Sequence, residues 1–272
     1  MRRVVFNKKG GVGKSTIACN LAALSSASGR KTLVVDLDPQ GNSTHYLGGG
    51  DAAALRPGVA EFFEQTLSFR LFREAPERFV HPTAFPNLYL LPAGPDMEVL
   101  QAKLEAHHKI YKLRDLLKEL QGFDEVWIDT PPSLGFFTLA ALIAAERCLI
   151  PFDCDAFSRS ALYSLVDSVQ EVKEDHNPDL SVEGIVVNQY QARANLPRQL
   201  VEELVAEGHP VLEPFLRSSV KVRESHQAGK PLVHLAPSHK LTLEFMALHA
   251  ALQKPPRRGA PRKKKAGTLQ RV

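Results

Sequence analysis

The sequence predicts an α/β fold in which helices cover both faces of a doubly wound, mostly parallel β-sheet. Three observations support this prediction. A short apolar strand leads through a glycine-rich loop into a helix, two later apolar segments each end in aspartate, and strand-like and helix-like segments alternate along the 272 residues. Strands that alternate with helices form parallel sheets, because each helix returns the chain to the edge where the next strand begins.

The first predicted unit is a strand, a loop and a helix. Residues 3–7 form a short apolar run with β-branched side chains, and residues 14–24 repeat apolar side chains at helical spacing. Gly10, Gly11 and Gly13 lie between these two segments. A glycine-rich turn between a strand and a helix is the context in which a phosphate-binding loop is found.

This loop carries a deviant phosphate-binding motif. A standard P-loop reads G-x-x-x-x-G-K-[ST] and would need glycine at position 8, where this chain has Lys8. The motif that remains is K-G-G-x-G-K-[ST], in which Lys14 takes the usual lysine position and Lys9 is a second cation ahead of the loop. Its residues are Lys9, Gly10, Gly11, Val12, Gly13, Lys14, Ser15 and Thr16.

The residue types of this motif suit a nucleoside triphosphate. Glycines allow backbone conformations that direct successive N–H groups at phosphate oxygens, and the helix N-terminus adds its positive dipole end. Lys14 would bring its ammonium group to the β- and γ-phosphates, and the Ser15 hydroxyl would bind Mg²⁺. The sequence therefore predicts a P-loop NTPase fold.

Two apolar segments end in the acids that such a site needs. Residues 32–38 end in Asp36 and Asp38, and residues 125–129 end in Asp129. Ligands bind at the carboxyl edge of open α/β sheets, so we expect these carboxylates to converge on the magnesium phosphate. Asp129 suits the role of holding Mg²⁺ through water, because this ion keeps much of its hydration shell.

The later segments continue the alternation of strands and helices. Residues 44–86 are irregular, and the pattern there favours two short helices at 59–67 and 71–79. The other predicted elements are a strand at 88–91, an amphipathic helix with apolar residues from 110 to 120, a strand at 147–151, a helix with an apolar face from 162 to 172, a strand at 184–187 and a final helix at 240–252.

Composition favours one globular domain at residues 1–254. The chain is 44% hydrophobic, and no run approaches the roughly 18 apolar residues of a membrane-spanning helix. No apolar leader follows Met1, and Cys19, Cys148 and Cys154 lack the spacing of a metal site. We therefore expect a soluble, cytoplasmic protein without integral membrane association, whose cysteines are small core residues.

Residues 255–272 form a separate basic tail. This segment holds seven basic residues and no acid, which is more positive charge than the net +4 of the whole chain. Its prolines and glycines disfavour a helix, so it is typical of a disordered polycation that binds phosphate backbones, or of a solubilising terminus. It lacks the apolar face of a membrane-anchoring helix, and DNA suits it better than an anionic membrane surface. Its basic residues are Arg257, Arg258, Arg262, Lys263, Lys264, Lys265 and Arg271.

Taken together, these motifs resemble the ParA/MinD family of deviant Walker A ATPases, and within it the short ParA/Soj-like partition proteins. The segments that carry the resemblance follow the family's order over nearly the whole chain, at residues 9–16, 35–42, 128–132, 220–225 and 229–231. The first segment is highly specific, and the second and third are specific in combination. The fourth is looser, because this chain has Lys221 and then Arg223-Glu224 where the family usually has Arg before Ser-Glu.

The resemblance implies an ATP-sandwich homodimer. In such a dimer Lys9 reaches across to the phosphates held by the other subunit, as an arginine finger does, and Asp38 positions or polarises the attacking water. Lys9, Lys14 and Asp38 would then be the catalytic residues. Mg²⁺ would lie among Ser15, Asp38 and Asp129.

The resemblance also suggests where the base of ATP lies. Asn188 fits the family's position for reading the adenine edge, although a strand-end asparagine is also an ordinary turn residue. Pro214 and Phe215 fit the loop beside the base.

Non-specific double-stranded DNA and a ParB-like stimulating protein are the implied partners. Only eight residues precede Lys9, too few for a helix-turn-helix, so sequence-specific operator binding is not expected. A ParB-like protein would stimulate slow ATP hydrolysis and release the protein, which implies a nucleoid-associated ATPase in the partition of chromosome or plasmid DNA. The expected DNA contacts are Lys221, Arg223, Lys230, Arg257, Arg258, Lys263, Lys264 and Lys265.

Two rival functions stay open at this point. A ParA-like ATPase could position a cargo other than DNA, such as a protein complex or compartment. The same deviant loop also occurs in biosynthetic enzymes that resemble dethiobiotin synthetase, where ATP phosphorylates a carboxylate of a small substrate. Dependence of the ATPase on a metabolite, with no response to DNA, would favour the biosynthetic enzyme.

Overall fold

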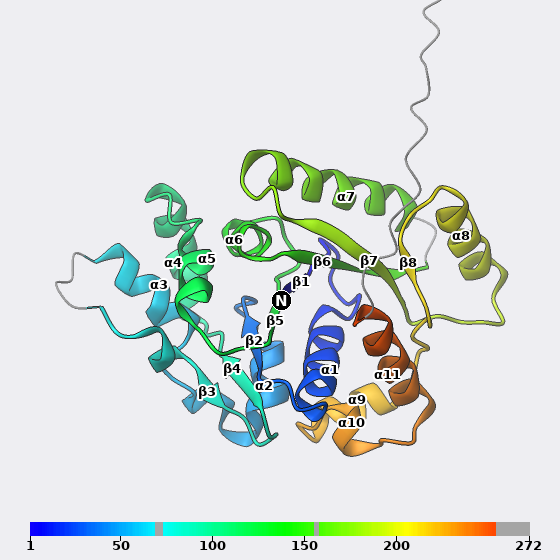
Figure 1. The fold of residues 1–272 in the computed structure, drawn as a ribbon, viewed down its shortest axis with the longest axis horizontal. Coiled ribbons are helices and arrows are strands. Elements are labelled where there is room, and N and C mark those ends of the chain that lie inside the picture. The colour runs from blue at the N-terminus through cyan, green and yellow to red at the C-terminus, as the bar shows by residue number, and fades with distance from the viewer. Residues whose placement is uncertain (69–72, 155–157, 254–272) are drawn as a thin grey trace, which may run out of the picture.

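The computed structural model describes residues 1–68, 73–154 and 158–253. The strands in these ranges form a single sheet, and its neighbouring strands are parallel except for the antiparallel pair at one edge (Figure 1). In sheet order the strands are β3 (His81–Pro82), β4 (Leu88–Leu91), β2 (Thr32–Asp36), β5 (Glu125–Asp129), β1 (Arg2–Val5), β6 (Arg147–Asp153), β7 (Ser181–Asn188) and β8 (Val211–Leu212). This sheet confirms the predicted α/β class.

Helices cover both faces of the sheet, as the alternation of segments predicts. The helices that pack on one face are α3 (Val59–Leu67), α4 (Asp96–Ala106), α5 (Lys112–Glu119), α6 (Phe136–Ala144), α7 (Ser158–Asp175) and α8 (Asn195–Ala206). Those on the opposite face are α1 (Lys14–Ala27), α2 (Asn42–Gly48), α9 (Lys221–Gln227), α10 (Leu232–Leu235) and α11 (Lys240–Leu252). The described residues also contain two short 3₁₀ helices, η1 (Gly49–Ala54) and η2 (Pro76–Phe79).

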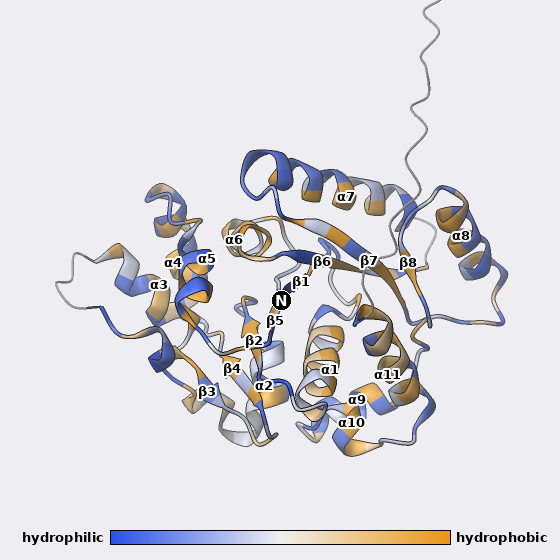
Figure 2. Ribbon diagram, in the orientation of Figure 1, coloured by the Kyte–Doolittle hydropathy of each residue, from blue (hydrophilic) through white to orange (hydrophobic). Residues whose placement is uncertain are grey.

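Helix α1, which follows the glycine-rich loop, is buried on nearly every side. It packs on β5 and is covered by α2, α10 and α11. Figure 2 accordingly shows α1 mostly white and orange, whereas α7 carries bands of blue and orange. A helix without a polar face belongs in the interior, so the sheet and the helices around α1 hold the loop before it in place.

The register of the parallel strands brings chemically active side chains to one edge of the sheet. Asp36 at the end of β2 is opposite Asp129 at the end of β5. Asp153 at the end of β6 is opposite Asn188 at the end of β7. Since β1 lies between β5 and β6, the loop that leaves β1 is flanked by both pairs. This carboxyl edge is where open α/β sheets bind their ligands.

Several predicted elements agree closely with the structure. Helix α3 and the final helix have the predicted limits, and Cys19 and Cys148 are buried while Cys154 is half-buried. The predicted helix at 71–79 is wrong at residues 73–75, because helical structure there begins only at Pro76. Ala75 has extended backbone, with ψ 143°, which is the conformation that a following proline favours. Residues 71 and 72 lie outside the described ranges.

In the described ranges no helix is long and apolar enough to cross a membrane. The basic tail at 255–272 lies outside these ranges, so the division into a domain at 1–254 and a tail stays a prediction.

Candidate nucleotide-binding site

The glycine-rich loop between β1 and α1 is built as a phosphate cradle. Gly11 and Gly13 have φ values of +75° and +91°, a region that favours glycine. A Cβ atom on Gly13 would lie 2.4 Å from Nδ2 of Asn188, so the loop has no room for a side chain there. Asn188 in turn donates a hydrogen bond of 2.8 Å to the carbonyl oxygen of Val12. The end of β7 therefore fixes the shape of the loop.

Lys14 folds back along this loop. Its ammonium nitrogen donates to the carbonyl oxygen of Lys9 at 3.0 Å, and the side chain is buried. Burial lowers the pKa of Lys14, and the negative charges of Asp129 and Asp38 partly oppose that shift. The lysine is thus held inside the cradle, where phosphate oxygens would accept its hydrogen bonds.

Asp129 lies beside the first turn of α1 with one oxygen in use and one without a partner. Its Oδ2 accepts a hydrogen bond of 2.7 Å from the Ser43 hydroxyl, while Oδ1 is buried and has no hydrogen-bond partner among the described residues. Burial raises the pKa of Asp129, and the nearby hydroxyl groups of Ser15 and Ser43 oppose the rise. An unsatisfied buried carboxylate oxygen fits a water molecule of hydrated Mg²⁺.

The rest of the candidate magnesium site is sparse. In the described part of the chain, no cluster of three or more His, Cys, Asp or Glu side chains could hold a metal ion. Mg²⁺ characteristically uses one or two protein groups together with waters and substrate phosphates. Ser15 and Asp129, with the phosphates of a nucleotide, fit that pattern.

Asp38 and Asp36 have different surroundings, although only one residue lies between them. Asp38 Oδ1 accepts a hydrogen bond of 3.0 Å from the Gln40 backbone, and burial raises the pKa of this carboxyl. Asp36 is fully buried and accepts hydrogen bonds from the Asp38 backbone and from both the backbone and hydroxyl of Thr44. Asp36 therefore holds the turn into α2, and its expected place beside the magnesium phosphate stays a prediction.

The two lysines ahead of the glycines contact the β6–α7 unit. Lys9 is 45% exposed, and its ammonium nitrogen lies 2.6 Å from Oδ2 of Asp153. Lys8 donates to the hydroxyl of Ser168 on α7 at 2.9 Å. Lys9 and Lys14 thus occupy different places: Lys14 is inside the cradle, and Lys9 is at its outer rim.

The predicted base-binding residues lie together at the end of β7. Backbone hydrogen bonds from Leu216 to Val187 and from Tyr190 to Leu216 align the 213–217 segment with this strand. The ring of Phe215 packs edge-on against Tyr190, with centroids 4.9 Å apart. Asn188 thus contacts the P-loop and Phe215 lies on the segment beside the end of β7, and their role at adenine stays a prediction.

The predicted DNA-contacting residues of the folded part lie on and after α9. Arg223 and Lys230 are exposed, and Lys221 forms an ion pair with Glu224 one turn later. The predicted contacts in the tail, from Arg257 to Lys265, lie outside the described residues.

Sequence reasoning missed several residues of the site. Ser43 and Thr44, which hold Asp129 and Asp36, lie at the start of α2, a few residues after the acids that end β2, so the sequence could have indicated their hydroxyls. Asp153 ends an apolar strand in the same way as Asp129 does. The contact of His226 with Thr16 had no local signal, because 210 residues separate them.

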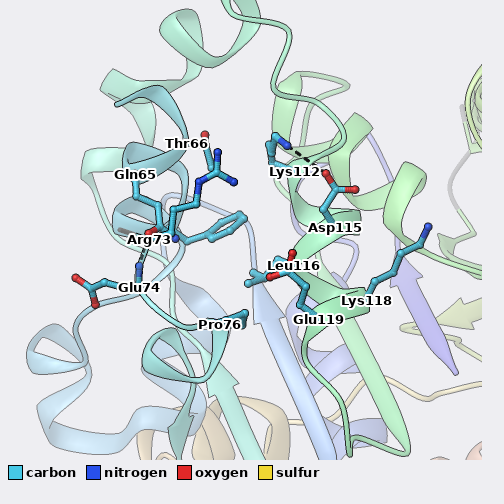
Figure 3. A pocket seen from close by; sticks show the side chains of 11 residues that line it. Gln65, Thr66, Arg73, Glu74, Pro76, Lys112, Asp115, Leu116, Lys118 and Glu119 are labelled. Atoms are coloured by element: carbon cyan, nitrogen blue, oxygen red, sulfur yellow. Dashed lines mark hydrogen bonds and ion pairs between the residues drawn. The ribbon is translucent and has the colours of Figure 1, made fainter. Parts of the chain in front are cut away.

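A pocket of about 330 Å³ lies elsewhere, between α3 and α5 (Figure 3). Arg73, Lys112 and Lys118 face it together with acids of both flanking segments, and one dashed contact in Figure 3 is the ion pair of Lys112 with Asp115. Because its charges are mixed and none of the P-loop residues lines it, this pocket is not the phosphate site.

Comparison with known proteins agrees with the geometry of the P-loop edge. A family model described as an AAA domain matches residues 3–182. The chain is 36% identical over 267 residues to the chromosome partitioning protein ParA of Myxococcus xanthus, covering 96% of this chain and 91% of that protein. It is 36% identical over 241 residues to the chromosome-partitioning ATPase Soj of Thermus thermophilus, covering 88% and 90%.

The chain belongs to the ParA/Soj family of P-loop ATPases. It is therefore an ATPase, as the P-loop and its acids predict.

Two solved structures share this fold over most of the chain. A cobyrinic acid a,c-diamide synthase from Mycobacterium smegmatis, solved with an ATP analogue and magnesium, has a TM-score of 0.79 at 28% identity and covers 92% of this chain and 93% of its own. The cell division ATPase MinD of Pyrococcus furiosus has a TM-score of 0.74 at 23% identity, covering 92% and 97%. The MinD likeness shows the fold alone, and it confirms the P-loop NTPase class.

Proposed function

We propose that this ParA/Soj-family ATPase is a nucleotide switch: ATP joins two chains into a dimer, the dimer binds DNA without sequence preference, and hydrolysis releases it. The observation that carries the proposal is the separation of the two lysines of one loop. Lys14 is folded into its own cradle, whereas Lys9 lies at the outer rim with its side chain half exposed. A cation at the rim is placed to neutralise phosphates held by a second copy.

ATP and Mg²⁺ are the cofactors of this ATPase. When bound, Mg²⁺ would neutralise the negative charge that develops on the phosphates. Ser15 and Asp129 would hold it, with the free Oδ1 of Asp129 accepting from a metal-bound water. The Lys14 ammonium group and the loop N–H groups hold the phosphates, and Asn188 and Phe215 flank the base.

Asp38 is the residue that we assign to the attacking water. Its carboxylate follows the end of β2, and the hydrogen bond from the Gln40 backbone fixes one of its oxygens. Burial raises its pKa, and a more basic carboxylate polarises a water molecule better. Lys9 of the second chain supplies the compensating positive charge, so hydrolysis requires the dimer. Turnover of the isolated chain is accordingly slow.

DNA binding is assigned to α9, to Lys230 and to the basic tail. Arg223 and Lys230 are exposed, and lysine and arginine side chains bind phosphate backbones of any sequence with counterion release. One copy offers few such contacts. Two copies joined by ATP double them, which makes DNA binding depend on nucleotide.

Partition of chromosomal or plasmid DNA is the process that this switch would serve. Relatives named for chromosome partitioning are 32–36% identical to this chain over 84–96% of its length, and they include ParA of Myxococcus xanthus and Soj of Thermus thermophilus. We infer a cytoplasmic, nucleoid-associated protein whose hydrolysis is stimulated by a ParB-like partner. The biosynthetic alternative retains the support of the cobyrinic acid synthase fold, at a lower identity of 28%.

Retention on duplex DNA of arbitrary sequence tests the proposal. The chain is measured with Mg-ATP, with Mg-ADP and without nucleotide, at several salt concentrations, because phosphate contacts weaken steeply with salt. Retention that requires ATP supports the switch. Equal retention with Mg-ATP, with Mg-ADP and without nucleotide would contradict the switch. An ATPase activity that responds to a small carboxylate but not to DNA would favour the biosynthetic alternative.

A further inference from the structure

Helix α9 has two different faces. Arg223 lies on its exposed face, whereas Ser225 is fully buried and His226 is half-buried on the face toward α1 and α2. The residues of the second face are not needed to contact DNA. They join α9 to the nucleotide site.

His226 makes the closest link. Its Nε2 lies 2.9 Å from the hydroxyl oxygen of Thr16, and its ring stacks on Tyr46 with centroids 4.1 Å apart and planes 8° from parallel. The neighbouring Ser225 hydroxyl contacts the hydroxyl of Tyr46, which also accepts a hydrogen bond of 3.2 Å from Asn20. One imidazole ring therefore touches both α1 and α2.

Each of these two helices begins at the nucleotide site. Thr16 is in the first turn of α1, directly after Ser15 of the P-loop. Tyr46 lies in α2, one turn after Ser43, whose hydroxyl donates to Asp129 Oδ2. The ring of His226 is therefore connected to both sides of the candidate magnesium site, through Thr16 and through Tyr46.

We propose that His226 is a positioning residue that couples the P-loop to α9, so that nucleotide binding sets the placement of the DNA-contacting face. When Mg-ATP orders the first turns of α1 and α2, Thr16 and Tyr46 move the ring and α9 moves with it. Coupling between sites requires an element that both sites bias, and α9 is that element. The inference rests on the proposed function, because it takes α9 as part of the DNA surface.

The chain offers a matched control at His234. This histidine also stacks on an aromatic ring, Phe85, with centroids 4.6 Å apart and planes 13° from parallel. It is on α10, the next helix, and no contact joins it to Thr16 among the described interactions. His226→Phe and His234→Phe both keep a stacked ring, but only the first removes a hydrogen bond to α1.

Two measurements on the full chain test the coupling. Hydrogen exchange of residues 221–227 is compared without nucleotide and with Mg-ATP, and affinity for an arbitrary duplex is compared with Mg-ATP and Mg-ADP. His226→Phe is expected to bind ATP and dimerise normally, to lose the ATP-induced protection of α9, and to lose about fivefold or more of the ATP-to-ADP affinity ratio. His234→Phe is expected to match the unmodified chain in both.

The outcomes separate this inference from the proposed function. If the unmodified chain binds DNA with the same affinity in Mg-ATP and in Mg-ADP, the proposed function fails. The coupling is then tested only by whether Mg-ATP changes hydrogen exchange in α9 and whether His226→Phe removes that change. If the unmodified chain switches and His226→Phe switches equally, His226 does not couple the sites. The inference is also overturned if His226→Phe loses ATP binding, or if His234→Phe loses as much of the ratio.

Discussion

The ammonium nitrogen of Lys9 lies 2.6 Å from Oδ2 of Asp153, across two neighbouring parallel strands. Lys9 follows β1 and Asp153 ends β6, so the pairing of these strands brings the two side chains together. Both are partly exposed, at 45% and 24%, and exposed ion pairs are worth at most about 1 kcal/mol. A triphosphate carries more negative charge than one carboxylate. In an ATP-bound dimer, we expect Lys9 to leave Asp153 for the partner's phosphates.

Lys9→Ala is expected to bind ATP and to remain monomeric. The nucleotide is held by Lys14 and the loop N–H groups, which this change leaves in place, whereas the charge supplied to the second copy is lost. Sedimentation velocity with Mg-ATP checks the prediction, and binding of a fluorescent ATP analogue shows that the cradle is intact. Lys8→Ala, beside it in sequence but bonded to Ser168, is the matched control. A Lys9→Ala dimer as tight as that of the unmodified chain would contradict the account.

Asp38→Ala is expected to trap an ATP-bound dimer on DNA. Removing the group that orients and polarises the attacking water lowers the hydrolysis rate by about 10²-fold or more, while leaving the phosphate contacts in place. Phosphate release and persistence on a DNA-coated surface after ATP is washed away are the measurements. Lys14→Gln, which loses nucleotide, should show neither hydrolysis nor retention. Full hydrolytic activity of Asp38→Ala would refute the role that we assign to it.

Ser43→Ala is expected to weaken magnesium binding and the fold together. The Ser43 hydroxyl donates to Asp129 Oδ2 at 2.7 Å, and leaving that buried carboxylate oxygen without a donor costs about 1–3 kcal/mol of unfolding free energy. A mispositioned Asp129 should raise the Mg²⁺ concentration needed for half-maximal hydrolysis. Urea unfolding and a magnesium titration measure the two effects.

Ser26→Ala gives the comparison for that change. Ser26 is also buried, but its hydroxyl donates only to the Ala23 carbonyl in the same helix among the described contacts. Its loss should leave the magnesium titration unchanged. If Ser43→Ala has the same magnesium titration curve as Ser26→Ala, the Ser43 hydroxyl does not position Asp129 for magnesium binding.

Glu125 should make stability depend on acid pH. Burial alone would raise its pKa, but a hydrogen bond from Ser25 and the charges of Arg3 and Arg30 outweigh it and hold the pKa at about 2, below the ordinary 4.5. A carboxyl with a lowered folded pKa stabilises the fold above pH 4.5 and loses this contribution as pH falls toward 2.

Glu125→Gln tests that dependence by urea unfolding between pH 7 and pH 2.5. We expect a loss of about 3 kcal/mol of unfolding free energy at pH 7, since that is what lowering the pKa of Glu125 from 4.5 to about 2 corresponds to. Arg3 keeps its ion pair with Glu183 in this variant. The difference in unfolding free energy between the two proteins should narrow below pH 4.5. The more exposed pair of Arg2 and Glu146 provides the control, and Glu146→Gln should cost under about 1 kcal/mol. A gap that stays constant with pH would contradict the assignment.

Much of the fold and part of the candidate site could be predicted from the sequence, because they depend on local patterns of residues. The P-loop, its lysines and the strand-end acids are local patterns in which residue types and spacing carry the chemistry. Lys14 and Asp129 lie at the carboxyl edge of the sheet, where those patterns place them. The final helix was predictable because its apolar spacing is regular.

The rest depends on contacts between distant segments. The roles of Asp36 and Asp38 separate only when Thr44 turns back on the strand end, so their spacing alone could not distinguish them. His226 contacts Thr16 from a helix 210 positions further along the chain, and no local sequence pattern predicts that contact. The edge strands β3 and β8 have two residues each, too short for a period to show.

The mass of the intact chain in solution tests the central claim most directly. One chain has a mass of 30.0 kDa. Light scattering at matched protein concentration should give this mass with Mg-ADP and twice this mass with Mg-ATP. A single-chain mass with both nucleotides, or a dimer with both, would contradict the account of Lys9 as the residue that makes the dimer depend on ATP.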